Sequence, residues 1–202
     1  MKILNIALTG IALVGLTACS SGNVVSRAMT SPNALLSEGY TLQTPSYNIT
    51  AVNVTVPPEL IATEDNGYKP NADIVWHGDP YGDRRAQVAA IFKDAMRQGV
   101  SGIRGQRKVI MSIEVARFHA LTPRARYTVG GNHDIHFVIR ILDATTGVEL
   151  EPARMVETDL NALGGVEALA AERQGLTQKV RITAHLAQLI QTEMASARPV
   201  PS

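Results

Sequence analysis

The chain lacks several features on which common functions depend. It has a single cysteine among 202 residues, so it forms neither an internal disulfide nor a multi-cysteine metal site. Aromatic residues make up 4% of the chain, too few for a platform that stacks bases or sugars. The formal net charge is +1, which offers no general attraction to nucleic acid. We therefore expect no nucleic-acid partner.

Common catalytic and nucleotide-binding motifs are also missing. No G-x-S-x-G sequence occurs, and this motif would mark a serine nucleophile between a strand and a helix. The glycines of residues 99–105 do not have the G-x-G-x-x-G spacing, and they follow a predicted helix instead of opening one. The sequence thus predicts a protein that is not an enzyme and that needs no cofactor.

The first eighteen residues have the pattern of a secretory signal. Lys2 supplies the positive charge, an apolar run covers 3–14, and small residues follow. The run is short for a bilayer span.

A four-residue motif sharpens this interpretation. Leu16-Thr17-Ala18-Cys19 resembles the lipobox of bacterial lipoproteins, in which a leucine and two small residues precede an obligatory cysteine. The resemblance implies that Cys19 is the lipidation site: its thiol is diacylated, the peptide is cut before it, and the new amine is acylated. Two or more acyl chains anchor a protein stably, whereas a single chain holds marginally.

The residue after the cysteine bears on localisation. Ser20 stands where an aspartate would resemble an inner-membrane retention signal, so the outer membrane, facing the periplasm, is favoured. Cleavage removes one basic residue, Lys2, from the 19 basic residues, which leaves 18 against 18 acidic residues. The mature chain is neutral, so lipid must do the anchoring.

Composition along the chain predicts four segments. We expect a signal peptide at 1–18, a lipidated cysteine and flexible tether at 19–46, one periplasmic domain at 47–197 and a loose tail at 198–202. The tether assignment depends on polar and turn-forming residues without a sustained apolar period.

Within the domain, hydrophobic periodicity predicts an α+β fold. Apolar residues alternate in 49–56, 109–115 and 135–141, and we expect these segments to be strands. We expect further short strands at 73–77 and, after Pro152, at 155–160. Helical spacing predicts a helix over 83–98, with Gly99 as its C-cap, and a second one from about Val166, which Gly175 kinks. The order β-β-α-β-β-β-α favours one mainly antiparallel sheet with both helices packed on one face.

The remaining polar residues suggest two further features. Glu114, His136 and Arg140, together with Arg117, should lie on the sheet face that the helices leave uncovered. Two basic groups, one at 104–108 and one at Arg124 and Arg126, should lie at opposite ends of the third strand. Either group could bind an anionic headgroup or an acidic partner.

The cluster His133, Asp134 and His136 is the candidate for catalytic chemistry. Two histidines three residues apart can share a metal on a helix, but side chains alternate along a strand. We therefore expect His133 and His136 to point to opposite faces, and the sequence predicts no metal site. A small hydrolase or metal-dependent enzyme that uses these three residues stays an alternative.

The body of the chain resembles an uncharacterised family of alphaproteobacterial lipoproteins found in relatives of Rhodobacter. The segments that carry the resemblance are Ala72-Asp73-Ile74-Val75-Trp76, Gly82-Asp83-Arg84, Gly130-Gly131-Asn132-His133-Asp134-Ile135 and Leu142-Asp143-Ala144-Thr145-Thr146-Gly147. That family brings no known activity. The order of strands and helices is also similar to that of envelope lipoproteins that act as auxiliary subunits of lipid or lipopolysaccharide transport machines.

These observations lead to one functional interpretation and two alternatives. We expect a triacylated bacterial lipoprotein, palmitate being the usual acyl chain, that serves as a non-catalytic accessory subunit and binds an envelope protein partner. It would do so by its exposed sheet face or by an open strand edge. The alternatives are the enzyme described above and a carrier that shelters lipid between sheet and helices.

Overall fold

The computed structural model describes residues 24–28 and 40–201 of the chain. The strands are β1 (Val24–Ala28), β2 (Tyr40–Gln43), β3 (Tyr47–Thr55), β4 (Ala62–Thr63), β5 (Ile74–Val75), β6 (Arg107–His119), β7 (Gly131–Asp143), β8 (Arg154–Ala162) and β9 (Arg198–Pro201). The helices are α2 (Arg84–Val100), α3 (Pro123–Arg126), α4 (Gly165–Arg173) and α5 (Gln178–Ala195). The predicted signal peptide and Cys19 lie outside the described residues.

One seven-stranded sheet forms the centre of the structure. Its order is β1-β8-β7-β6-β5-β4, and β3 also pairs with β6. The pairs β1–β8, β8–β7 and β7–β6 are antiparallel, whereas β3 and β5 run parallel to β6. The predicted class, an α+β fold with a mainly antiparallel sheet, is confirmed. The parallel pairs were not foreseen; they arise because a crossover through α2 separates β3 and β5 from β6.

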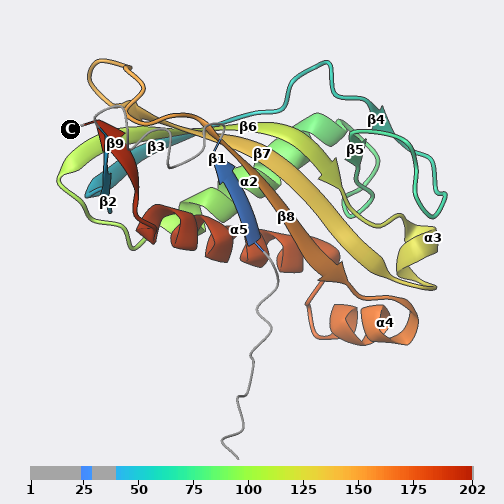
Figure 1. The fold of residues 1–202 in the computed structure, drawn as a ribbon. Helices are drawn as coiled ribbons and strands as arrows, with labels where there is room; N and C mark the ends of the chain where they lie inside the picture. The colour runs from blue at the N-terminus through green and yellow to red at the C-terminus, as the bar shows by residue number, and fades with distance from the viewer. Residues whose placement is uncertain (1–23, 29–39, 202) are drawn as a thin grey trace, which may run out of the picture.

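Both long helices, α2 and α5, cover the same face of this sheet, as Figure 1 shows. The alternating residues of β6 and β7, among them Met111, Ile113, Phe137 and Ile139, are fully buried against the helices. Phe92 of α2 meets Phe137 edge to face, with ring centroids 5.2 Å apart. Burial of this main apolar cluster is the chief source of stability.

The start of α2 agrees with the sequence, but its end does not. Asp83 is the N-cap, and its side chain accepts a hydrogen bond from the amide of Ala86 at 3.1 Å. The predicted C-cap role of Gly99 is wrong, since α2 runs on to Val100. A Cβ at position 99 would lie 2.4 Å from the carbonyl oxygen of Ala187, so this glycine lets α2 and α5 approach closely.

A β-bulge in β6 decides which way Arg117 points. The pairing register with β7 shifts between Val115 and Arg117, so Phe118 turns into the core and Arg117 turns outward. The expected place of Arg117, on the face that the helices leave uncovered, is therefore confirmed. Strict alternation from Val109 would have buried it.

The predicted C-terminal helix is two helices. Gly175 has a φ of +77°, which ends α4, and the Thr177 side chain then caps α5 by accepting from the amide of Val180. A further short helix, α3, begins at a Thr122 cap followed by Pro123.

The segments expected to be a tether and a loose tail contain paired strands. In the predicted tether, β1 pairs with β8, and β2 pairs with β9 of the predicted tail. Arg198 is 7% exposed and donates to the carboxylate of Glu151 at 3.2 Å and to the Met194 carbonyl at 3.0 Å. The sequence did not predict these short strands, because periodicity does not show which segments find a strand or a buried charge to pair with.

We predict that Gly99→Ala lowers the free energy of unfolding by about 1–3 kcal/mol, since its methyl group would meet the α5 backbone. Denaturant unfolding of the full chain in detergent would measure the change.

Gly102→Ala is the matched control, because a Cβ there has nothing within 4 Å. It should leave stability unchanged or raise it by less than about 1 kcal/mol. Equal losses in both variants would contradict the close helix contact.

Candidate functional site

The structure divides the predicted cluster His133, Asp134 and His136 between the two faces of β7. His133 lies on the helix-covered face and is 1% exposed, whereas Asp134 and His136 lie on the other face. The expectation that the two histidines point to opposite sides is confirmed. The three residues therefore do not form one catalytic centre.

His133 is buried in an apolar and cationic environment. Neither of its ring nitrogens has a hydrogen-bond partner among the described residues. Burial, followed by the positive charges of Arg181 and Arg126, lowers the pKa of His133 to about 3. Burial also lowers the pKa of His185 on α5, which hydrogen-bonds Thr158 at 2.7 Å. His133 is thus a neutral core residue.

The outer face of the sheet holds a row of polar side chains. The carboxylate of Asp134 contacts His136 Nε2 at 2.7 Å and accepts from Arg117 Nε at 2.6 Å. A carboxylate can orient an imidazole for proton transfer, but a catalytic site would also need a nucleophile or a metal within reach. No group of three or more His, Cys, Asp or Glu residues is placed to hold a metal in 24–28 and 40–201.

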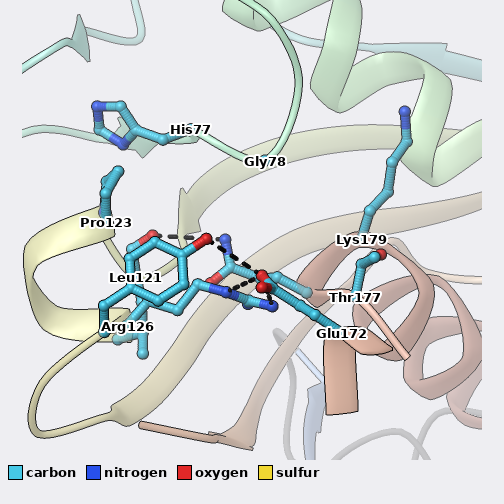
Figure 2. A pocket seen from close by; sticks show the side chains of 10 residues that line it. His77, Gly78, Leu121, Pro123, Arg126, Glu172, Thr177 and Lys179 are labelled. Carbon is cyan, nitrogen blue, oxygen red and sulfur yellow. Dashed lines mark hydrogen bonds and ion pairs between the residues drawn. The ribbon is translucent and has the colours of Figure 1, made fainter. Parts of the chain in front are cut away.

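A small pocket lies at the end of the domain that carries α3 and α4. Its volume is about 160 Å³, and Figure 2 shows that it opens between His77 and Gly78, α3, and the junction of α4 with α5. The lining residues are His77, Gly78, Leu121, Pro123, Arg126, Tyr127, Glu172, Thr177, Gln178 and Lys179.

The charged groups of this pocket are largely taken up in ion pairs, either with one another or with a neighbouring residue. Arg126 contacts Glu172 at 2.7 Å, and Lys179 contacts Asp79 at 2.8 Å. Burial raises the pKa of Asp79, but hydrogen bonds from Lys179 and Trp76 outweigh it and hold that pKa below its usual value. Such closed ion pairs in a small volume stabilise the contact between loops more than they offer charge to a ligand.

A larger groove runs beside β3. It has a volume of about 530 Å³ and is lined by Ile49, Thr50, Ala51, Val52, Arg97, Val100, Ser101 and Arg104. It therefore combines four consecutive residues of one strand with the C-terminal end of α2 and the loop that follows. Arg97 and Arg104 are both exposed.

A third hollow, of about 490 Å³, lies at the start of β3 and β6. Its lining includes Gln43, Tyr47, Arg107 and Glu149. Burial raises the pKa of Tyr47. Arg107 contacts Asp143 at 3.2 Å, so this member of the predicted basic group already has a partner.

The sequence separated the two basic groups correctly but missed the groove. Residues 104–108 and Arg124 with Arg126 do lie at opposite ends of β6. Arg97 gave no signal, because an arginine on the exposed side of a helix is ordinary. The helical phase of Arg97 and its distance from residues 49–52 become meaningful only when α2 is placed against β3.

Comparison with protein families shows to which family the chain belongs. A family model for a family of unknown function, DUF6778, matches residues 47–202. The chain belongs to this family. The expectation of an uncharacterised family is thereby confirmed, and the match begins at the residue at which the domain was predicted to begin.

Similar solved structures are distant. The PelC dodecamer from Paraburkholderia phytofirmans matches with a TM-score of 0.36 and 11% identity over 87% of this chain and 99% of that one. A candidate lipoprotein from Caulobacter crescentus CB15 matches with a TM-score of 0.28 and 20% identity over 53% of this chain and 80% of that one. Structural similarity at this level says nothing about the function of this chain. No curated protein matches the sequence.

Protonation of His133 should couple stability to pH. Its imidazole stays neutral in the folded state down to a pKa of about 3, whereas the unfolded chain takes up the proton near 6.5. The unfolded state then binds more protons, so stability falls as the pH drops from about 6.5 towards 3, by at most about 1.4 kcal/mol per unit for this group.

We predict that His133→Met makes this acid-side slope shallower in denaturant unfolding of the full chain. His119 and His185, whose pKa values burial also lowers, keep part of the slope. Asn132→Met, at the exposed neighbouring position, is the control and should retain the wild-type slope. An unchanged slope in His133→Met would contradict the buried neutral histidine.

Proposed function

We propose that this chain is a non-catalytic, lipid-anchored protein of the bacterial envelope that binds an extended segment of a partner protein along β3. The observation that carries the proposal is the free edge of this strand. Among the residues that the structure describes, β3 forms a ladder with β6 on one side and with no strand on the other.

An unpaired strand edge offers a row of backbone donors and acceptors. A partner segment can extend the sheet by pairing with such a row, while grooves beside the edge select its side chains. The groove lined by 49–52 supplies this second element at the middle of β3. At a bulge in β3, the Thr50 hydroxyl donates to the Val109 carbonyl, 3.1 Å away. The bulge interrupts the regular edge and so limits pairing with the strand edges of other proteins.

The charge of the groove indicates what the partner segment carries. Arg97 and Arg104 lie on the walls of the groove, and no acidic residue is among its lining residues. Opposite charges across an interface steer association and fix the register. The partner segment should therefore carry carboxylates opposite these two arginines.

Attachment to a membrane rests on the sequence of the N-terminus. Among residues 24–28 and 40–201, no helix is both long and apolar enough to cross a bilayer. We propose that Cys19 is triacylated, that the chain is an alphaproteobacterial lipoprotein, and that it resides in the outer membrane facing the periplasm. The lipobox at 16–19 supports the acylation, and Ser20 supports the choice of membrane.

We predict that the chain produced in its bacterial host incorporates labelled palmitate and that Cys19→Ser abolishes the label. Intact mass spectrometry should show a mature chain that begins at Cys19 and carries acyl chains. Serine keeps the size of the side chain but cannot form the thioether, so it is the matched control. Equal labelling of both forms would overturn the anchor.

We predict that affinity capture from gently solubilised membranes recovers a stoichiometric envelope partner with the wild-type chain. The double variant Arg97→Glu/Arg104→Glu should recover at least about tenfold less, because carboxylates would then face carboxylates. A photo-crosslinking residue at Ala51 should join the same partner.

Lys93→Glu is the control for charge reversal, since Lys93 is exposed on α2 one turn before Arg97 and does not line the groove. It should capture the partner as well as the wild type does. Undiminished capture by the double variant, or crosslinks to no protein from Ala51, would contradict binding along β3.

A further inference from the structure

The end of the domain that carries α3 and α4 in Figure 1 exposes an unusual number of apolar side chains. Six of the eleven exposed large hydrophobic residues among the described residues lie in the two short segments 127–129 and 166–180. They are Tyr127, Val129, Val166, Leu169, Leu176 and Val180. Val166 is 81% exposed and Val129 is 74% exposed. Such a concentration marks an interaction surface.

The orientation of α4 also indicates that this surface contacts an apolar environment. The helix buries the small Ala168 and Ala171 and turns Val166, Leu169 and Ala170 outward. A helix that faces water does the reverse, with its larger apolar residues towards the core. The outward side of α4 therefore suits an apolar environment.

The turn before β7 extends the same surface. A Cβ on Gly164 would lie 2.2 Å from the amide nitrogen of Gly130, so the backbone around Val129 is in direct contact with the start of α4. Tyr127 also hydrogen-bonds Glu172 of α4 at 3.3 Å. Val129 and Val166 thus belong to one surface, which we call the α4 end.

The position of β1 brings the predicted anchor to this end. Val24 pairs with Thr158, and β1 runs antiparallel to β8. The N-terminal end of β1, at Val24, therefore points towards the side on which β8 leads to Ala162 and α4. Five residues span at most roughly 18 Å, so Cys19 lies within that distance of Val24.

We propose that the α4 end rests on the lipid leaflet that holds the acylated Cys19, with Val129, Val166 and Leu169 in the interface. This inference rests on the lipid anchor proposed above. An amphipathic surface gains by burying apolar side chains at the boundary between headgroups and acyl chains. The exposed Arg173 of α4 would meet anionic headgroups there.

This orientation is compatible with partner binding along β3. The strand pairs with the first half of β6, whereas α3 follows the last residue of β6. The free edge therefore lies towards the end of the sheet away from the membrane, open to the periplasm.

A fluorescent label on the α4 end tests the proposal. Acylation occupies the sulfur of Cys19, so Val166→Cys in the full acylated chain supplies the single thiol for an environment-sensitive nitrobenzoxadiazole probe. In vesicles of phosphatidylethanolamine and phosphatidylglycerol, we expect blue-shifted emission that lipids with a nitroxide on the acyl chain quench.

Val148→Cys is the matched control, because Val148 is 60% exposed and lies near the opposite end of β7. Its probe should emit as in water and resist quenching. Circular dichroism of both variants should match the wild type, since both side chains are exposed.

The outcomes separate this inference from the anchor itself. If mass spectrometry shows an acylated chain and the two probes respond alike, the α4 end is not on the leaflet although the anchor stands. If the chain is not acylated, the anchor fails, and the inference fails with it.

Discussion

The architecture depends on how the long strand β6 is paired. One edge of β6 pairs with β7 over most of its length, and the other edge takes β3 first and β5 afterwards. Its inward residues anchor the core beneath α2 and α5. β3 ends before β5 begins to pair, so the two strands lie one after the other along the same edge of β6. Each of them has a second edge, whose backbone groups β6 does not pair. β4 pairs with β5, whereas the edge of β3 stays open among the described residues.

The same arrangement gives the two ends of the domain different chemistry. At the start of β6 lie the arginine-lined groove and the buried ion pair between Arg198 of β9 and Glu151. At its other end, the loops around α3 and α4 close on one another through paired charges such as Arg126 and Glu172. Their apolar side chains then face outward. This difference between the two ends suits the anchored adaptor proposed above, with one end towards lipid and the other towards a partner.

The histidines show that local pattern sets the face to which a side chain points, whereas the tertiary structure sets what it contacts. Alternation along β7 was enough to predict that His133 and His136 point to opposite faces. It could not predict that Arg117 would meet Asp134 from β6, because a bulge directly before Arg117 sets that contact. Likewise, Gly99 has the sequence signature of a helix cap, yet its role is set by Ala187, 88 residues further along the chain.

The sequence by itself predicted the strands β3, β5, β6, β7 and β8, the helix α2 and the common face that α2 and α5 cover, because periodic burial leaves a local record in residue order. It also contains the linear motifs, a signal and a lipobox, on which the proposed localisation rests. Only the tertiary structure decided that β3 has a free edge, that β1 lies against β8 and that α4 turns its valine and leucine outward. These features depend on pairing and packing between segments far apart in the chain, and local sequence holds no record of which partner a segment meets.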